Sequence, residues 1–443
     1  MGKKKKSKWV LRWNSPAQPV LQTPLEVVIE QAPDDAPSEV EIQIWESDSP
    51  RVEPFGVTAH RVSTSSSPNS NTRNGIAVVW ATICSSMSCV TGEPVDRDLD
   101  FEVETEWLVI RGFDRDEQEI CGGTPEWLDG YVAALAEPLD LAPATIGAYH
   151  WYSPELWDEQ GICGQANACV HVNDGMETAF ARELPHEHEL NHVIFNHAHE
   201  PCVAVLSEGL AEYMRGTWPS AAGSIEQSSI EDVLAVSFDG VIMVSSDYHR
   251  ARHFVSFLVF EFGLEEVLTL CAMTPKGSTR GEFDDAALST IGVGLDELLA
   301  SYASYPICSE QEDRAKLWEC SREPVVALGP GDEYLFEIDA SCAHPNAVGP
   351  GGSRYHFSYQ VRILADGEYS WGFVPEPPPF DLTGAELRLE QCASCGDGAL
   401  GFTDAWMEKF ISLPRLLGAG DYTLQLVLPL EFAGMVRVEV VGH

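Results

Sequence analysis

Hydrophobic and polar residues alternate with a period of two near both ends of the chain and with a period of 3.6 in its middle. Before residue 98, the stretches LEVVIE, VEIQIWE and GIAVVWATI have the alternation of half-buried strands. Segments rich in Pro, Asp, Ser and Asn separate them. We therefore predict a β-rich N-terminal module over residues 21–98, preceded by a disordered basic start over residues 1–20.

The middle of the chain combines both periods. It opens with strand-like FEVETEWLVIRGF and a helix in TPEWLDGYVAALAEPL, for which Thr124 is the expected N-cap and Pro125 the first helical residue. ATIGAYHWY and ACVHVND read as further strands. The 3.6 period then predicts helices over residues 181–196, 203–215, 247–262, 264–273, 283–291 and 294–303. Residues 99–321 are thus predicted to be an α+β domain with a small mixed sheet followed by a helical half.

Alternation returns after the helical half. YHFSYQVRIL, AELRLEQ, AGDYTLQLVLPL and MVRVEVVG each alternate over a strand's length, with turn residues between them. Such a run of strands without helices is typical of two packed antiparallel sheets. Residues 322–443 are therefore predicted to form a C-terminal β-sandwich.

Charge excludes one class of partner. The chain of 443 residues has 27 basic and 69 acidic residues, a formal net charge of −42. Nucleic-acid binding needs clustered Lys and Arg, so no nucleic-acid partner is expected, and we interpret the charge as a solubility feature. No apolar run is long enough to span a bilayer. MGKKKKSKW resembles the basic part of an export signal, but no apolar segment follows it, so a signal peptide is not visible.

The chain contains an even number of cysteines, 12. Three close pairs, Cys84/Cys89, Cys163/Cys169 and Cys392/Cys395, lie in loop-like sequence where short bridges are sterically allowed, although spacing alone does not determine the pairing. A structural zinc is the alternative, but only CASC has a suitable spacing. We therefore predict disulfides and an extracytoplasmic location, either secreted or at the cell surface.

The heptapeptide HEHELNH at residues 186–192 is the strongest chemical signal. Two metal ligands on one helix face stand four residues apart, because four residues rotate only about 40° beyond a full turn. Only His188 finds a second histidine, His192, at this spacing, and Glu189 follows the first, which gives H-E-x-x-H. The surrounding ELPHEHELNHVIF can form a helix with Pro185 in its first turn. The alternative is a solvated, histidine-rich helix face.

A metal site on this helix needs a third ligand. The metzincin pattern H-E-x-x-H-x-x-G-x-x-H fails, because Phe195 and Ala198 occupy its Gly and final His positions. The next predicted helix, in VAVLSEGLAEYM, offers Glu208, sixteen positions after His192. Glu212 lies one turn further on the same face, where it could accept the free N–H of a ligated histidine. The two histidines and Glu208 leave a fourth position for water, which is the arrangement of catalytic Zn²⁺.

HELNH and LSEGLAEY together resemble the motifs of the gluzincin superfamily (MA clan) of zinc metallopeptidases, which includes thermolysin. The order of segments over residues 100–305 also resembles a bacterial branch of that clan. The resemblance implies a zincin-like fold for residues 99–321 and a general-base role for Glu189. It further implies an oxyanion donor just before a helix like HRARHFVSFLVFEFG, a place that Tyr248 occupies, with His249 and His253 as alternatives.

One departure from the family bears on the substrate. The aminopeptidase relatives carry a Gly-x-Met-Glu-Asn strand whose glutamate binds a free N-terminus. CGQANACV stands in its place, and the nearest equivalent of that glutamate is Asn167. This departure favours an endopeptidase. Asn191, inside the zinc motif, occupies a helix position that need not face the metal. The remaining polar residues of the region are expected to be solvated or to support the ligands: His186, Glu187, His197, His199 and Glu200.

The sequence therefore predicts a zinc-dependent endopeptidase that acts on a peptide or protein, with β modules that could bind a surface or polymer. Two alternatives stay open. The first is a binding or adhesion protein built on a peptidase-like scaffold, since fold does not fix function. The second is a zinc hydrolase of a non-peptide bond, because the same activated water would serve both reactions.

Overall fold

The computed structural model describes residues 99–164, 166–173, 175–216, 229–240, 243, 245–307, 314–376, 385–392 and 414–443, and the backbone of five strands before residue 99. The chain divides into two compact units, residues 1–91 and residues 92–443.

The first unit contains strands only among its described residues. Three of them form an antiparallel sheet in the order β1-β2-β5, and the other two pair with each other: β1 (Leu11–Trp13), β2 (Glu26–Ile29), β5 (Ala77–Trp80), β3 (Glu39–Ile44) and β4 (Phe55–His60). The β-rich character predicted for this region is confirmed. Strand β1 lies within the first 20 residues, where the sequence predicted no structure.

The second unit opens with a mixed five-stranded sheet in the order β6-β7-β8-β10-β9. Its strands are β6 (Phe101–Glu104), β7 (Leu108–Phe113), β8 (Gly147–Tyr152), β9 (Ala168–Asn173) and β10 (Met176–Ala181). The three central strands are parallel and the two edge strands antiparallel. The helix predicted over residues 181–196 is present, but its predicted start is wrong. METAFA is held as β10 between β8 and β9, so the helix begins only at residue 187 and Pro185 precedes it.

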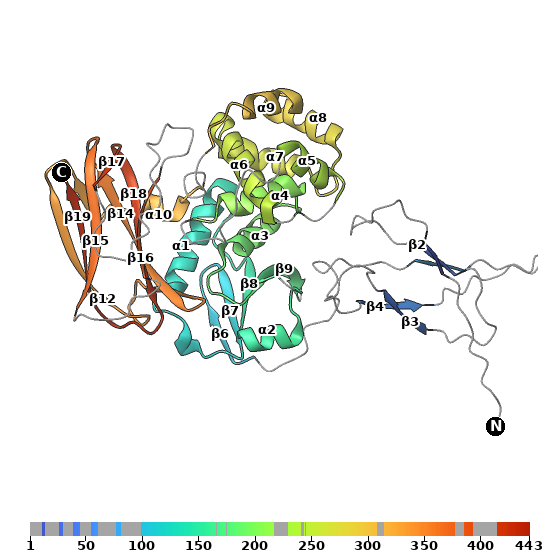
Figure 1. Ribbon diagram of the computed structural model, residues 1–443, viewed down its shortest axis with the longest axis horizontal. Coiled ribbons are helices and arrows are strands. Elements are labelled where there is room, and N and C mark those ends of the chain that lie inside the picture. The colour runs from blue at the N-terminus through green and yellow to red at the C-terminus, as the bar shows by residue number, and fades with distance from the viewer. Residues whose placement is uncertain are drawn as a thin grey trace, which may run out of the picture. The chain divides into compact units, whose positions relative to one another are not determined.

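Two helices of this unit connect strands of the sheet in sequence, and the others follow its last strand (Figure 1). The helices are α1 (Thr124–Ala136), α2 (Pro154–Gln160), α3 (Glu187–Ala198), α4 (Ala204–Tyr213), α5 (Ile230–Phe238), α6 (Ser245–Phe262), α7 (Leu264–Met273), α8 (Arg280–Thr290), α9 (Leu295–Tyr302) and α10 (Leu317–Ser321), with short 3₁₀ turns at Glu117–Glu119 and Glu137–Leu139. The predicted bounds of α7 are confirmed at both ends, and those of α9 to within one residue. Helices α2, α5 and α10 were not predicted.

The C-terminal β-sandwich is confirmed. One sheet has the order β11-β14-β18-β16 with β13 beside β14, and the other has the order β12-β19-β15-β17. The strands are β11 (Val326–Leu328), β12 (Glu333–Ala340), β13 (Val348–Gly351), β14 (Arg354–Ile363), β15 (Gly367–Glu376), β16 (Glu386–Gln391), β17 (Arg415–Leu417), β18 (Gly420–Pro429) and β19 (Gly434–Gly442). All pairs are antiparallel except β11 with β14. Inward side chains of both sheets, such as Phe357 and Trp371, share one core.

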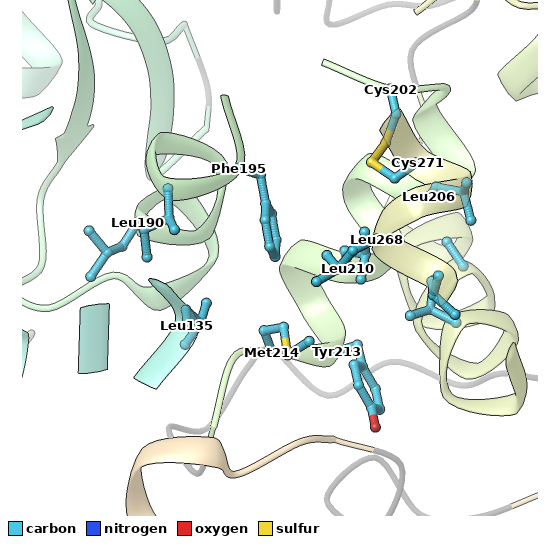
Figure 2. Packing of buried hydrophobic residues seen from close by; sticks show 14 of the residues in the cluster. Leu135, Leu190, Phe195, Cys202, Leu206, Leu210, Tyr213, Met214, Leu268 and Cys271 are labelled. Atoms are coloured by element: carbon cyan, nitrogen blue, oxygen red, sulfur yellow. A yellow bond between two sulfur atoms is a disulfide. The ribbon is translucent and has the colours of Figure 1, made fainter. Parts of the chain in front are cut away.

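One large apolar core joins the mixed sheet to most of the helices, and a smaller one joins it to α2. Figure 2 shows Phe195 of α3 pointing toward Leu210 of α4, with Leu206 near the Cys202–Cys271 disulfide and Leu190 on the other side of α3. Burying side chains of this size stabilises the fold by about 1.5–3 kcal/mol each. Helix α3 is therefore fixed on one side by α4.

Two glycines let these elements approach closely enough. A Cβ on Gly147 of β8 would come within 2.3 Å of a Val193 methyl group of α3. A Cβ on Gly209 of α4 would come within 2.8 Å of the Ala251 carbonyl oxygen of α6. Only glycine permits such contacts, so the Gly of SEGLAEY brings α6 against α4.

Thr124 does not cap helix α1. The cap is Gly123, and Thr124 is the first helical residue. Its hydroxyl donates to the Gly349 carbonyl at 2.7 Å and accepts from the Gly349 N–H at 3.0 Å, so it joins α1 to β13 of the sandwich.

Each of the eight described cysteines is bridged, which confirms the prediction of disulfides. Cys163 pairs with Cys169, and the long-range pairs are Cys121–Cys342, Cys202–Cys271 and Cys320–Cys392. The suggested Cys392/Cys395 bridge is wrong, because Cys392 lies against helix α10 and bonds to Cys320. Cys84 and Cys89 lie outside the described residues. In the described part of the chain, no helix is both long enough and apolar enough to cross a bilayer.

A buried histidine in β8 makes the sheet sensitive to acid. His150 is 3% exposed, and its ring lies 5.0 Å from those of Phe113 and Phe180. Neither ring nitrogen has a hydrogen-bond partner among the described residues. Burial, assisted by the nearby Arg111 charge, lowers the pKa of His150 to about 3. The folded protein therefore binds this proton far less readily than the unfolded chain does.

Replacing His150 by phenylalanine is expected to reduce acid destabilisation. Because the folded pKa lies below the unfolded value of about 6.5, the stability that neutral His150 preserves is complete above pH 6.5 and is lost as the pH falls towards 3. The loss amounts to about 4 kcal/mol by pH 3. Urea unfolding at pH 7 and pH 4 would measure it. An equal loss of stability in His150→Phe and the parent would contradict the prediction.

Candidate metal centre

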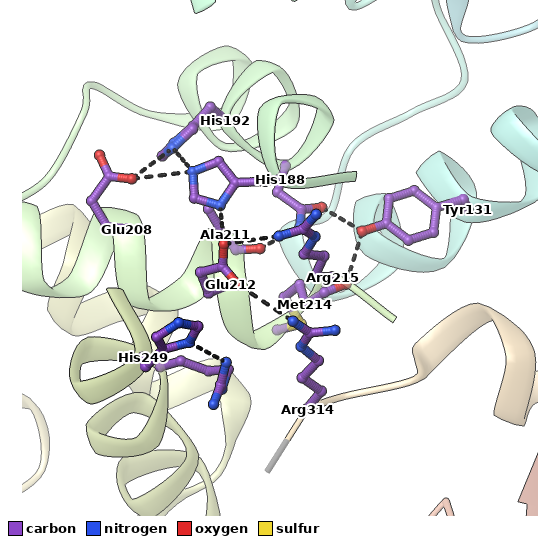
Figure 3. A network of polar contacts seen from close by, with 12 residues as sticks. Tyr131, His188, His192, Glu208, Ala211, Glu212, Met214, Arg215, His249 and Arg314 are labelled. Atoms are coloured by element: carbon purple, nitrogen blue, oxygen red, sulfur yellow. Dashed lines mark hydrogen bonds and ion pairs between the residues drawn. The ribbon is translucent and has the colours of Figure 1, made fainter. Parts of the chain in front are cut away.

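Helices α3 and α4 bring three predicted ligands together. His188 and His192 stand one turn apart on α3, and Glu208 faces them from α4 (Figure 3). The Nε2 atoms of the two histidines are 3.2 Å apart, and each lies 3.2 Å from Oε2 of Glu208. The three potential ligand atoms therefore form an equilateral triangle.

The triangle fits zinc in donor type and in size. Two imidazole nitrogens and one carboxylate oxygen are zinc donors, with bond lengths of about 2.0–2.1 Å. A tetrahedral ion with such bonds separates its donors by about 3.3 Å. The side chains of His188 and His192 are 8% and 12% exposed and that of Glu208 is 24% exposed, so water can reach the triangle from the Glu208 side. The residues present thus fit a zinc ion with one position open to solvent.

Glu212 supports the first histidine from behind. Its Oε1 lies 2.9 Å from His188 Nδ1, which is an ion-pair distance. A proton on Nδ1 would leave the Nε2 lone pair directed into the triangle. Arg215 Nη1 donates to the same oxygen at 3.2 Å, and Arg314 Nη2 lies 3.6 Å from Oε2. The structure thus places Glu212 beside His188, as predicted. Neither arginine was predicted.

The charges of the site favour a cation at its centre. Burial opposes a charge on His188, but its hydrogen bonds with Glu208 and Glu212 outweigh this and raise its pKa to about 10. Burial likewise opposes a charge on Glu208, yet His192 and His188 hold the pKa of this carboxyl below its ordinary value. Burial also disfavours ionised Glu212, but Arg215 and His188 hold its pKa well below the ordinary range. The groups that stabilise a proton here would stabilise a metal ion in its place.

Glu189 and Tyr248 lie near the triangle. One carboxylate oxygen of Glu189 and one ring nitrogen of each histidine lie within 4.8 Å of one another. The Tyr248 ring lies 5.7 Å from that of His188. Burial first, and then the charges of Glu208 and Glu189, raise the pKa of Tyr248, so its hydroxyl stays protonated and can donate. Tyr248 belongs to the first turn of α6, which begins at Ser245, two residues before the predicted start.

The two alternative histidines of α6 are committed elsewhere. His253 is 1% exposed, and its ring nitrogens lie 2.7 Å from the Tyr302 hydroxyl and 3.0 Å from the Pro306 carbonyl. His249 is buried, with Nδ1 3.2 Å from Nη1 of Arg252. Both side chains are therefore satisfied by partners on α6, on α9 or after α9.

Asn191 proves to be structural. It is fully buried, donates to the Ala211 carbonyl of α4 at 2.8 Å and accepts from the Tyr131 hydroxyl at 2.8 Å. Asn191 therefore joins α3 to α4 and α1, which fixes the helices that carry the ligands. Its position within the motif gave no sign of these partners, because they come from other helices.

Glu187 is buried, although it was among the polar residues expected to be solvated or to support the ligands. It is 1% exposed, and burial raises its pKa to about 8 although Arg215 opposes this. Burial also lowers the pKa of His186 well below its ordinary value. Of the other three, His197 and Glu200 are exposed, and His199 is half-buried with Nδ1 2.8 Å from the Glu200 carbonyl.

Comparisons with known proteins add little. No protein-family model matches the chain, and no curated protein matches it. Among solved structures, the pre-peptidase C-terminal domain of a collagenase from Bacillus anthracis matches 27% of this chain and 97% of its own length, at 11% identity and a TM-score of 0.17. A likeness this weak carries no argument about function, so the site must be interpreted from its own geometry.

Proposed function

We propose that this protein is a zinc-dependent endopeptidase of the gluzincin type. The observation that carries the proposal is the triangle of His188, His192 and Glu208, whose edges are all 3.2 Å and match the spacing of zinc donors. These residues would hold the ion. A surface helix with accidental histidines would not place a glutamate of another helix at the same distance from both.

Zinc bound there would supply Lewis acidity, which acidifies water and polarises a carbonyl group. Glu189 would take a proton from the attacking water as its oxygen bonds to the amide carbon. The same carboxyl group would then give that proton to the leaving nitrogen as the C–N bond breaks. The proton taken from water is the one returned to the leaving nitrogen, so no further reactant is needed. Glu189 thus serves first as base and then as acid.

Two further residues assist this step. Glu212 keeps His188 in the tautomer and orientation that direct Nε2 to the ion. Tyr248, with its protonated hydroxyl, would donate to the oxyanion that develops on the substrate carbonyl. Asn167, the nearest equivalent of the amine-binding glutamate in aminopeptidases, is exposed and carries no charge, which supports cleavage within a chain.

Replacing Tyr248 by phenylalanine is expected to lower kcat about a hundredfold with little change in KM, because a donor to the oxyanion acts mainly in the transition state. Steady-state hydrolysis of a quenched peptide would measure both constants. Tyr359→Phe, in the sandwich, is the matched control. A Tyr248→Phe enzyme with the parent's kcat would exclude Tyr248 as the donor.

Zinc content and proteolysis test the proposal together. We expect about one zinc per purified chain, a lower melting temperature after chelation, and cleavage of a quenched unfolded protein that chelation abolishes and added zinc restores. Protein without zinc affinity would overturn the metal site. Stoichiometric zinc without cleavage of any peptide bond would instead favour a scaffold or a hydrolase of another bond.

The disulfides are compatible with an oxidising compartment, and we propose an extracytoplasmic location. A role of the β-sandwich in binding a surface or polymer remains a separate proposal. Because Cys121–Cys342 and Thr124 fasten the sandwich to helix α1, any such ligand would be held at a fixed position relative to α1.

A further inference from the structure

Arg314 reaches the metal centre from outside the two motif helices. It opens a segment of residues 314–321, called the strap below, which ends with helix α10 and leads into the sandwich. The Arg314 side chain is 1% exposed, and its Nη2 lies 3.6 Å from Oε2 of Glu212, the carboxylate that holds His188. A buried guanidinium needs a compensating charge, and this one faces the support of a predicted ligand.

The strap is fastened to the end of α4. The N–H of Ala315 donates to the Tyr213 carbonyl at 2.8 Å, directly after Glu212. Glu319 is 3% exposed, and a Cβ on Gly216 would come within 2.9 Å of its Oε1. Gly216 also has a φ of +71°, which favours glycine. The chain after α4 and the strap therefore pack closely on each other.

The other side of the strap is held by the sandwich. Cys320 is bonded to Cys392 after β16, and its carbonyl accepts from Gln360 of β14 at 3.2 Å. Lys316 Nζ lies 3.9 Å from Glu390 Oε2 of β16, and both side chains are at most 3% exposed. The strap that carries Arg314 is thus held by the sandwich as well as by α4.

We propose that Arg314 is a positioning residue for the metal centre and that the β-sandwich, through the strap, holds it in place. The inference rests on the proposed zinc site and extends it. Arg215 donates to one oxygen of Glu212 and Arg314 forms an ion pair with the other, so the two guanidinium groups together orient the carboxylate that faces His188 Nδ1. The sandwich is accordingly part of the catalytic structure and cannot be removed without loss.

The direction in which zinc affinity changes tells whether Arg314 acts by positioning Glu212 or only through its charge. Loss of a positive charge near a cation would strengthen zinc binding, whereas loss of the clamp on Glu212 would weaken it. Arg314→Met removes both, and Arg314→Lys keeps the charge but not the planar fork. Arg322→Met is the matched control, since Arg322 follows the strap and donates to the Ser358 carbonyl of the sandwich at 3.0 Å.

Competition with a chelator would measure the zinc affinity of these full-length variants, and the visible spectrum of bound Co²⁺ would report ligand geometry. We expect zinc binding about tenfold weaker and a changed Co²⁺ spectrum in Arg314→Met, partial recovery in Arg314→Lys, and parental values in Arg322→Met. Unchanged or tighter binding in Arg314→Met would overturn the positioning role. If Arg314→Met does not fold, Arg314→Lys decides. An Arg314→Lys protein with the parent's zinc affinity and Co²⁺ spectrum would then overturn the positioning role of Arg314.

A double variant tests the dependence on the sandwich. Cys320→Ser with Cys392→Ser is expected to weaken zinc binding at least threefold, whereas Cys163→Ser with Cys169→Ser, away from the strap, leaves it unchanged. Equal affinities in the two double variants would overturn the link between sandwich and metal centre. An unaltered protein that binds no zinc would refute the proposed function itself, whereas zinc binding with no response to Arg314 refutes only this inference.

Discussion

Replacing Glu189 by glutamine is expected to reduce hydrolysis of an unfolded protein by about a thousandfold while zinc content stays at the parent's level. A positioned general acid–base contributes about 10²–10⁴ in rate, and glutamine neither accepts nor returns the proton. The Glu189 carboxylate lies within 4.8 Å of a ring nitrogen of both ligand histidines but makes no part of the 3.2 Å triangle. Metal binding should therefore be independent of it.

Release of fluorescence from a quenched unfolded substrate would measure the rate, with zinc determined on the same preparation. Glu200→Gln is the matched control, because Glu200 is an exposed glutamate just after α3 and should have the parent's activity. Residual activity of Glu189→Gln within tenfold of the parent would show that another group moves the proton. Loss of zinc in this variant would instead place Glu189 among the ligands.

Local periodicity was enough to predict the centre of the site. His188 and His192 meet because four residues make about one helical turn, and Glu208 and Glu212 obey the same rule on the next helix. The positions of these four side chains in the structure follow from that rule and from the packing of α3 on α4. Their role as zinc ligands and support stays a prediction until metal is measured.

Residues that meet across long sequence distances could not be predicted in this way. Arg314 lies far from Glu212 in sequence and meets it only in the folded chain, and no local pattern records that contact. Arg215 was within reach of the sequence, since it stands three residues after Glu212, one helical turn away. Cys392 likewise had a near neighbour in sequence but bonds to Cys320, 72 positions away, because tertiary packing decides which sulfurs meet.

Misplaced elements have a related cause. The helix predicted from residue 181 starts too early, because Ala181 ends METAFA, which pairs on both sides as the strand β10. Strand β15, GEYSWGFVPE, was missed because Gly and Pro interrupt its alternation. Its pairing with β19 and the burial of Trp371 and Phe373 outweigh those weak local preferences.

Replacing Glu208 by alanine is expected to weaken zinc binding several hundredfold and to abolish proteolysis. Structural zinc sites with four protein ligands have binding free energies of about 10–16 kcal/mol, so one ligand accounts for about 3–4 kcal/mol. Glu208 is also the only anionic member of the triangle, and it lies 3.2 Å from both ring nitrogens. Without Glu208, the nearest carboxylate is that of Glu212. It faces Nδ1 of His188 and not the Nε2 atoms of the triangle, so it does not replace the missing ligand.

Chelator competition would give the zinc dissociation constants of Glu208→Ala and the parent, and far-UV circular dichroism would show that both are folded. Glu261→Ala, an exposed glutamate on α6, is the matched control and should bind zinc as the parent does. The geometry requires the loss in Glu208→Ala to exceed that in Arg314→Met, because a direct ligand is removed in one case and a support of its neighbour in the other. A Glu208→Ala protein with parental zinc affinity would mean that the triangle is not the metal site, since the two remaining nitrogens alone cannot hold the ion as firmly.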